Sequence, residues 1–273
     1  MEPNEPTQVT PQSHPWRRIL TGIGALVVLA LILVPPIAPL EKADLVGYAI
    51  CHQIPDRSFY LEDHRLPLCA RCTGTYLGVA IGFASLAILG RWRAGEMPSN
   101  GLIVVLVGFI CIMGVDGVNS YLYLLLGRSL LYTPQNWLRA TTGSLNGIAL
   151  SLIVWPVFNF TLWKHPADKR PVESIWELLA MLAVAAVAVL VVQTEPGWLL
   201  YPFALLTSAG VLWMLSLVNT MILLILFRRD SQAETWQDAL AALSMGLLAT
   251  AIELSTMGTV RYLLTGTRGW PLG

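Results

Sequence analysis

Long apolar runs separated by short polar segments dominate the pattern of this chain. The runs do not alternate between polar and apolar residues, as membrane strands would, and most reach the roughly 20 residues that a helix needs to cross a bilayer. They lie near residues 19–34, 73–90, 100–126, 140–163, 174–193, 199–227 and 238–264. The pattern therefore predicts an all-α, polytopic transmembrane helical bundle with about seven spans.

Composition strengthens this interpretation. The 273 residues are 55% hydrophobic and only 12% charged, and their mean hydropathy is +0.61, which is too apolar for an ordinary soluble domain. The net charge is zero, and no basic stripe with interleaved aromatic residues occurs. The lipid bilayer is thus the expected partner, and nucleic acid is not.

The same pattern divides the chain into three parts. Residues 1–15 are polar and rich in proline, which predicts a disordered cytoplasmic tail. Residues 16–163 form a four-span core with a polar loop at 41–73, and residues 164–273 form a three-span C-terminal extension. The first apolar run follows two arginines, as in a signal peptide, but it is long and lacks an Ala-x-Ala site. We expect a retained span, with cleavage as the alternative.

Basic residues in alternate connectors indicate the orientation. They are Arg17, Arg18, Arg91, Arg93, Lys164, Lys169, Arg170, Arg228 and Arg229. Because cytoplasmic loops carry an excess of Lys and Arg, the N-terminus is expected inside and the C-terminus outside. The opposite connectors also hold arginines, several of them among acidic residues. This orientation places the 41–73 loop on the extracytoplasmic face of a plasma membrane.

The polar loop holds three of the four cysteines and two histidines. Zinc favours thiolate and imidazole ligands, and Cys-x-x-Cys is a frequent half-site. The loop therefore predicts a metal site, with zinc as the expected ion, on Cys51, His52, Cys69 and Cys72. Adjacent residues such as Cys51 and His52 rarely reach the same ion, so His64 is an alternative ligand.

A redox interpretation competes with the metal site. Cys69 and Cys72 lie where a helix is expected to begin, and the positive end of a helix stabilises a thiolate. The chain would then be a membrane thiol-disulfide oxidoreductase that passes electrons from this pair towards a quinone, with Cys51 as a third thiol. A static disulfide is the remaining interpretation. Cys111, alone in an apolar span, is expected to be a packing residue.

Polar residues inside spans are costly and are therefore functional candidates. Asp116 lies in the outer half of the third span, with Asn119 on the same helical face, and Glu253 lies near the middle of the last span. Asp116 is either a catalytic group or a structural partner of Arg71 or Arg139. A transporter with Asp116 and Glu253 as coupling acids is a further alternative.

Glycine spacing predicts which spans pack most closely. Gly74, Gly78 and Gly82 recur every four residues in the second span, as do Gly143 and Gly147 in the fourth. An arginine precedes each series, which indicates a duplicated helical hairpin. Close packing of these spans would gather a set of polar residues at their outer end: Arg71, Cys72, Asp116, Asn136 and Arg139.

These motifs also support a family assignment. The segments Cys51-His52-Gln53, Arg57-Ser58-Phe59 and Cys69-Ala70-Arg71-Cys72-Thr73-Gly74, followed by Asp116-Gly117 and by Asn136, Arg139 and Gly143, carry the likeness. The chain resembles, over roughly residues 40–155, a predicted prokaryotic integral membrane family catalogued as domain of unknown function two-zero-eight-five. Asn119 stands where that family is expected to have glutamine. The resemblance implies a prokaryotic membrane and supports the site residues, but it implies no reaction.

The leading hypothesis is a metal site over a cavity lined by arginine and aspartate. Arginines beside an apolar interior suit the phosphate or carboxylate group of an anionic lipid or small molecule. The expected catalytic residues are Asp116, Arg71 and Arg139. The expected ligand-binding residues are Arg57, Asn119, Asn136 and Glu253. The sequence leaves open whether the protein is an enzyme, and it defines neither a substrate nor an oligomeric state.

Overall fold

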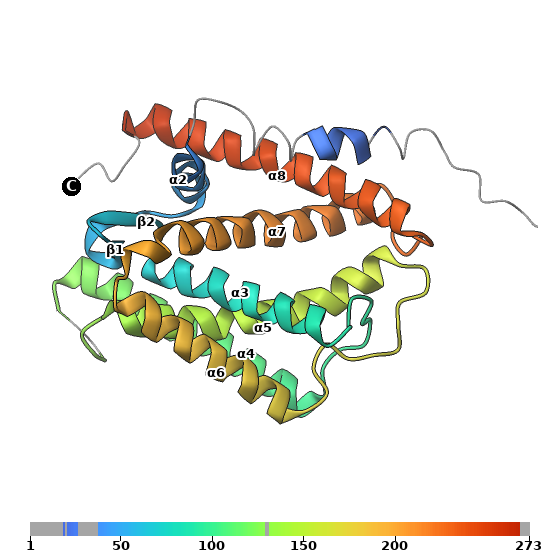
Figure 1. Ribbon diagram of the computed structural model, residues 1–273, viewed down its shortest axis with the longest axis horizontal. Coiled ribbons are helices and arrows are strands. Elements are labelled where there is room, and N and C mark those ends of the chain that lie inside the picture. The colour runs from blue at the N-terminus through green and yellow to red at the C-terminus, as the bar shows by residue number, and fades with distance from the viewer. Residues whose placement is uncertain (1–18, 20, 27–37, 129–130, 268–273) are drawn as a thin grey trace, which may run out of the picture.

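The computed structural model describes residues 19, 21–26, 38–128 and 131–267 of the chain. The described part is almost wholly helical, with one small hairpin (Figure 1). Its elements are α2 (Pro39–Ile50), η1 (Pro55–Arg57), β1 (Ser58–Leu61), β2 (His64–Cys69), α3 (Ala70–Ile88), α4 (Asn100–Leu126), α5 (Asn136–Leu162), α6 (Ile175–Gln193), η2 (Gly197–Leu199), α7 (Leu200–Leu226) and α8 (Trp236–Thr265).

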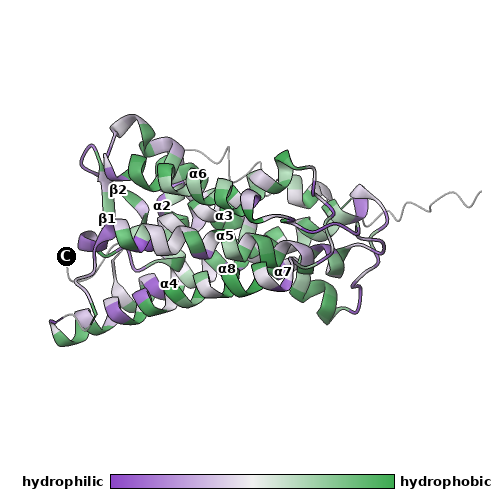
Figure 2. Ribbon diagram, turned by 90° about the horizontal axis from the view of Figure 1, so that it is seen from below, coloured by the Kyte–Doolittle hydropathy of each residue, from purple (hydrophilic) through white to green (hydrophobic). Residues whose placement is uncertain are grey.

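Six helical segments within the described residues are long and apolar enough to cross a membrane. They correspond to the last six of the predicted apolar runs, and they confirm a polytopic helical bundle. Apolar residues follow the lengths of the helices, and polar residues gather at the two ends (Figure 2). Of the first predicted span, residues 19 and 21–26 are helical, whereas residues 27–34 and the predicted tail lie outside the described residues.

Two spans begin earlier than their apolar runs. Helix α3 begins at Ala70 instead of near residue 73, and α5 begins at Asn136 instead of near residue 140. The additional turns carry Arg71 and Arg139, whose side chains form hydrogen bonds within the protein. A polar residue with an internal partner does not end a helix, so hydropathy alone places these boundaries too late. The polar 41–73 segment is likewise ordered, as the end of α2, a hairpin and the start of α3.

Helices α3 and α5 pack backbone to backbone at the centre of the bundle. A Cβ atom added to Gly74 would collide with the carbonyl oxygen of Ala140, and one added to Gly78 would collide with that of Ser144. Only glycine leaves room for a carbonyl group at these points. This packing confirms the pairing that the glycine spacing predicts.

The α3–α5 contacts are reciprocal. Gly143 of α5 faces the carbonyl oxygen of Arg71, and Gly147 faces that of Thr75. The contact that Gly74 of α3 makes with α5 thus has the same form as the contact that Gly143 of α5 makes with α3. Helix α4 packs on α5, and α6 packs on α3 and α5. The glycine contacts of α3 and α5 therefore correspond to each other when the two helices are exchanged, which is consistent with the predicted duplication.

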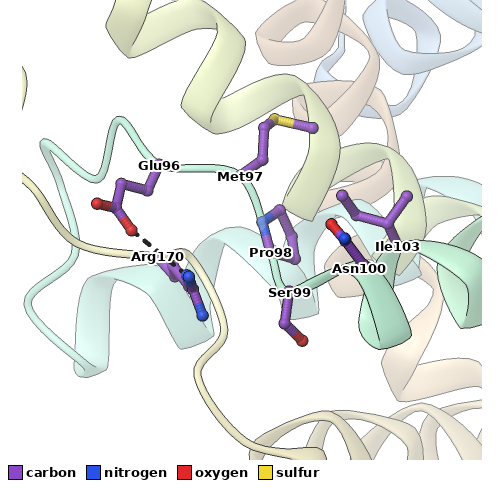
Figure 3. A pocket seen from close by; sticks show the side chains of 7 residues that line it. All are labelled: Glu96, Met97, Pro98, Ser99, Asn100, Ile103 and Arg170. Atoms are coloured by element: carbon purple, nitrogen blue, oxygen red, sulfur yellow. Dashed lines mark ion pairs between the residues drawn. The ribbon is translucent and has the colours of Figure 1, made fainter.

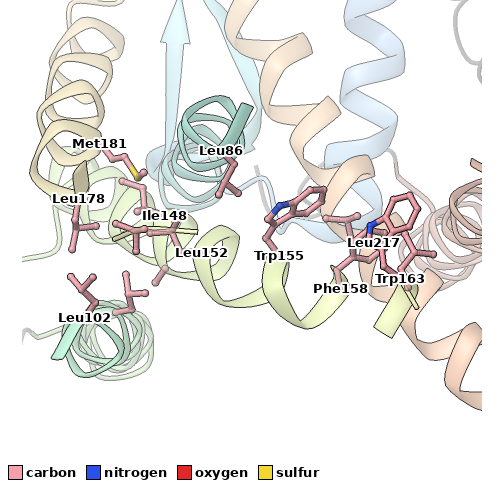
Figure 4. Close-up of a cluster of buried hydrophobic side chains, with 14 of the residues drawn as sticks. Leu86, Leu102, Ile148, Leu152, Trp155, Phe158, Trp163, Leu178, Met181 and Leu217 are labelled. Atoms are coloured by element: carbon pink, nitrogen blue, oxygen red, sulfur yellow. The ribbon is translucent and has the colours of Figure 1, made fainter. Parts of the chain in front are cut away.

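The remaining helices form a second layer beside this pair. Helix α7 packs on α3, α8 packs on α7, and α2 lies between α7 and α8 (Figure 1). The main apolar cluster lies towards the C-terminal ends of α3 and α5 (Figure 4). It draws one buried side chain or more from each of the six described spans, among them Leu86, Leu102, Leu152, Leu178, Leu217 and Ala239. This cluster fixes the bundle at the end opposite the cysteines.

Connectors at that opposite end are tied to the bundle by polar contacts. Arg91 forms a two-pronged ion pair with Glu177, in which its Nη1 and Nη2 atoms lie 2.7 and 2.8 Å from the carboxylate oxygens. The Trp155 indole donates to the carbonyl oxygen of Arg91, and the Asn159 amide donates to that of Ala94. The basic residues of this end therefore contribute to the fold as well as to the charge bias between the two faces.

The glycine contacts predict a strong asymmetry between two substitutions. Gly147→Leu should destabilise the protein by about 1–3 kcal/mol or more, because its side chain collides with the α3 backbone, which cannot move aside. The matched variant Gly108→Leu adds the same side chain to α4 where nothing lies within 4 Å. Thermal unfolding of both variants in detergent measures the difference. Equal stability of the two would contradict the assigned packing.

Candidate functional site

Three cysteines converge at the N-terminal end of α3. Cys51 directly follows α2, Cys69 ends β2 and immediately precedes α3, and Cys72 lies in the first turn of α3. Their sulfur atoms all lie within 4.8 Å of one another. Cys51 is buried, the other two are half-buried, and all three are free thiols. The structure thus brings together three of the four predicted metal ligands.

A tight hairpin returns the chain to this point. Strands β1 and β2 pair antiparallel, with Ser58 opposite Cys69. The turn between them places Glu62 and Asp63 at φ values of 48° and 64°, the left-handed conformation that two-residue hairpin loops require. The hairpin therefore carries Cys69 back towards the end of α2.

Gln53 fixes the hairpin against α2, a role that the sequence analysis did not identify. Its side chain is 2% exposed and donates to the carbonyl oxygen of Pro67 at 2.8 Å. Arg65 in turn donates to the carbonyl oxygen of Gln53 at 2.6 Å. The position of Gln53 directly after Cys51-His52 is the one sequence feature that connects it with the site.

The thiols are electrostatically unequal. Hydrogen bonds from the thiols of Cys51 and Cys72, together with the charge of Arg71, hold the pKa of Cys69 well below its usual range. The hydrogen bond to Cys69 raises the pKa of Cys51 to about 11. The backbone N–H of Cys69 also donates to the sulfur of Cys51 at 3.3 Å. Of these two thiols, that of Cys69 is therefore the more readily deprotonated.

Neither predicted nitrogen ligand joins the sulfur atoms. His52 is exposed, and its ring is not part of the group. The backbone at Cys51 is extended, so consecutive side chains point in opposite directions and His52 points away from the sulfurs. His64 is also exposed, with its Nδ1 atom 3.0 Å from the carbonyl oxygen of Glu62.

Arg261 of the last span holds the backbone that carries Cys51. Its guanidinium donates to the carbonyl oxygens of Tyr48, Cys51 and His52, and it lies 4.3 Å from the centre of the Tyr48 ring. A cation is favourable at the carbonyl end of a helix. The C-terminal extension therefore contributes directly to the position of one of the three thiols.

Asp116 is the buried partner of Arg71. Its side chain is 1% exposed. Its Oδ2 atom accepts from Arg71 Nε at 3.0 Å and from Thr142 at 3.3 Å, and its Oδ1 atom accepts from Tyr132 at 2.8 Å. Burial, together with this bond, raises the pKa of Tyr132 to about 12, so the phenol remains a donor. Asp116 thus orients Arg71, which is the structural pairing that the sequence offered as one of two alternatives.

The two predicted asparagines have different roles. Asn119 is 2% exposed and binds the connector after α4, accepting from the backbone N–H of Leu131 at 3.2 Å and donating to the carbonyl oxygen of Tyr132 at 2.8 Å. Asn136 donates to the carbonyl oxygen of Ser58 at 3.3 Å and accepts from Arg139 at 2.8 Å. Only Asn136 contacts one of the predicted site arginines.

Three arginines surround the thiols with a single buried carboxylate between them. Arg57, Arg71 and Arg139 all lie within electrostatic range of Cys69. Arg57 donates to the carbonyl oxygen of Ser120 at 3.2 Å, and burial lowers its pKa. Arg139 is 6% exposed, and its Nε atom has no hydrogen-bond partner among the described residues. The cluster therefore carries excess positive charge.

Glu253 lies apart from this cluster, between α7 and α8. It is half-buried and accepts a hydrogen bond from Asn219 at 2.8 Å, and the same amide donates to Thr250 at 3.0 Å. It therefore belongs to a separate polar contact between two spans.

A pocket lies away from the thiols as well, beside the start of α4 (Figure 3). Glu96 and Arg170 form an ion pair across it with an N–O distance of 3.3 Å. It contains none of the predicted site residues.

Fold and composition together define a multi-pass membrane protein. Its α3–α5 core and thiol segment match the profile of a family described as Predicted membrane protein (DUF2085) over residues 51–153. The chain belongs to this family.

Two archaeal relatives support this assignment. The chain is 33% identical to the uncharacterized protein MJ1492 of Methanocaldococcus jannaschii over 116 residues, which are 42% of this chain and 67% of that protein. It is 32% identical to an uncharacterized protein of Methanothermobacter thermautotrophicus over 104 residues, or 38% of this chain and 83% of the relative. No solved structure matches the chain significantly.

The contacts of Arg261 predict that it controls access to Cys51. In a chain whose other three cysteines are replaced by serine, Arg261→Gln should increase the rate of maleimide labelling at Cys51 about tenfold or more. The loss of charged hydrogen bonds, worth ~1.5 kcal/mol or more, has this effect on local opening. Arg228→Gln, at the opposite end of the bundle, is the control. Equal labelling rates in the two variants would refute this role.

Proposed function

We propose that this protein binds zinc through Cys51, Cys69 and Cys72 at the extracytoplasmic end of the bundle. The observation that carries the proposal is the convergence of three free sulfur atoms, from the end of α2, the end of β2 and the start of α3, within 4.8 Å. Zinc prefers thiolates in a tetrahedral arrangement. The low pKa of Cys69 is consistent with a thiolate ligand.

The fourth coordination position has no protein ligand in this proposal, since His52 and His64 lie outside the sulfur group. A zinc ion with three protein ligands keeps a position for water or a small anion. The orientation rests on the basic connectors at the opposite end of the bundle, which favour a cytoplasmic location for that end. The site would then face the outside of an archaeal or bacterial plasma membrane.

An anionic amphiphile is the ligand class that the surrounding charges favour. Arg57 and Arg139 carry charge that no carboxylate within hydrogen-bonding distance offsets among the described residues, and the helices beside them are apolar. Guanidinium groups bind phosphate and carboxylate oxygens strongly. Because Asp116 is fully engaged with Arg71, Thr142 and Tyr132, we infer a binding function and assign no reaction.

A membrane thiol-disulfide oxidoreductase is the second candidate. The mutual proximity of the three free thiols favours it. Oxidation of Cys69 and Cys72 to a disulfide would release two electrons and two protons, which a quinone in the bilayer would accept to become a quinol. Elemental analysis and thiol counting, described below, distinguish this candidate from the metal site.

Elemental analysis of the purified protein tests the metal site. We expect about one zinc per chain, and loss of most of it on Cys51→Ser, Cys69→Ser or Cys72→Ser, because each change removes one of three thiolate ligands. Cys111→Ser provides the matched control, since Cys111 lies exposed in the middle of α4 and should leave the zinc content unchanged.

Thiol counting before and after reduction completes this test. Four reactive thiols after unfolding and chelation, with or without reductant, would support zinc binding. A protein without metal that contains a reversible Cys69–Cys72 disulfide would overturn the zinc proposal and support the oxidoreductase.

A further inference from the structure

The arginines near the starts of α3 and α5 differ in their partners. Arg71 of α3 is neutralised by Asp116 of α4. Arg139 of α5 forms a hydrogen bond with the neutral Asn136 and has no carboxylate partner among the described residues, and α6, which packs on α3 and α5, supplies no carboxylate at that end. The one acid of α6, Glu177, lies in its first turn and pairs with Arg91 at the opposite end of the bundle.

Arg139 is consequently a buried cation with neutral hydrogen-bond partners. It is 6% exposed, its Nη1 atom donates to the amide oxygen of Asn136 at 2.8 Å, and its Nε atom is unpartnered within the described part of the chain. A buried charge without a counter-charge is strongly unfavourable, and an unsatisfied buried donor adds to the cost. A bound anion would remove both costs, because it would neutralise the charge and accept a hydrogen bond from the Nε atom.

Arg57 stands beside the same position. Asn136 connects the two arginines, because its amide nitrogen donates to the carbonyl oxygens of Asp56 and Ser58 on either side of Arg57. The charges of Arg57 and Arg71 also act directly on Arg139. Asp56 is exposed, and Asp116 is bound to Arg71. The guanidinium groups of Arg57 and Arg139 therefore lie near each other, and neither forms an ion pair with a carboxylate of the described residues.

We propose that Arg139 and Arg57 bind a phosphate-type oxyanion, whose charge compensates two guanidinium groups that form no ion pair within the described part of the chain. Two guanidinium forks match the several oxygens of a phosphate group, which a single planar carboxylate would not satisfy. The same chemistry is offered by inorganic phosphate and by the phosphomonoester headgroup of a lipid. The inference rests on the anion-binding part of the proposed function and names its residues and ligand class.

The decisive variant introduces a carboxylate of the protein itself beside Arg139. Asn136→Asp keeps the shape of the side chain and places a negative oxygen next to Arg139, where the amide oxygen now accepts at 2.8 Å. The internal carboxylate should compete with the ligand, so phosphate binding should weaken about tenfold or more. The change adds an ion pair but removes the two hydrogen bonds from the amide nitrogen to the carbonyl oxygens of Asp56 and Ser58, each 3.3 Å long. The melting temperature therefore checks that the variant remains folded.

Two probes distinguish the source of the phosphate. Equilibrium binding of inorganic phosphate to the full-length protein in detergent tests the free anion. Lipid nanodiscs that contain either phosphatidic acid with phosphatidylcholine or phosphatidylcholine alone test the headgroup, with the shift in melting temperature as the readout. Asn100→Asp, an isosteric change at the start of α4 on the opposite end, controls for the added charge.

Each result bears on the inference. Binding of either probe that Asn136→Asp weakens and Asn100→Asp does not would support it, and the responsive probe would identify the source. Absence of binding to both probes, or equal binding by both variants, would overturn it. Phosphatidic acid binding that Asn136→Asp leaves unchanged would retain an anionic lipid for the protein but not this site. Zinc content, measured on the same samples, reports separately on the metal proposal.

Discussion

The backbone contact between α3 and α5 is the constraint on which the cysteine-containing end of the molecule depends. Gly74 and Gly147 admit carbonyl groups of the opposite helix where any side chain would collide. Helices this close must also bring the residues of their first turns together, and those residues include Arg71 and Arg139. The energetic gain from close helix packing is thus accompanied by repulsion between two guanidinium groups. Asp116 and Asn136, which bind these groups, reduce the cost of this repulsion.

Charge balance connects the thiols with the arginines. A divalent zinc ion with three thiolates retains one net negative charge, and Asp116 adds a second, whereas Arg57, Arg71 and Arg139 supply three positive charges within electrostatic range of Cys69. The arginines would therefore stabilise the thiolates that a metal requires. One positive charge remains after this compensation, which is consistent with a further anionic ligand. The proposed metal and anion sites would thus have a common electrostatic basis.

The sequence predicted local features well and connections between distant residues poorly. Apolar runs located the six described spans, glycine spacing identified the α3–α5 pair, and Cys69-x-x-Cys72 identified the sulfur group together with Cys51. His52 lies outside the sulfur group because the backbone at Cys51 is extended, and the spacing of residues in the sequence does not reveal that conformation. The engagement of Asp116 with Tyr132 likewise depends on how a connector folds back, which hydropathy does not encode.

Arg261 illustrates why part of such a site escapes motif analysis. It acts on the thiol segment through three backbone carbonyl oxygens, and every residue offers a carbonyl whatever its side chain. The contact therefore requires no particular residue type at the positions whose carbonyl oxygens accept the hydrogen bonds, and it leaves no motif in the sequence. The family match ends at residue 153, whereas this support comes from the last span. The matched region thus contains the three clustered cysteines, while the geometry of one of them depends on a helix outside that region.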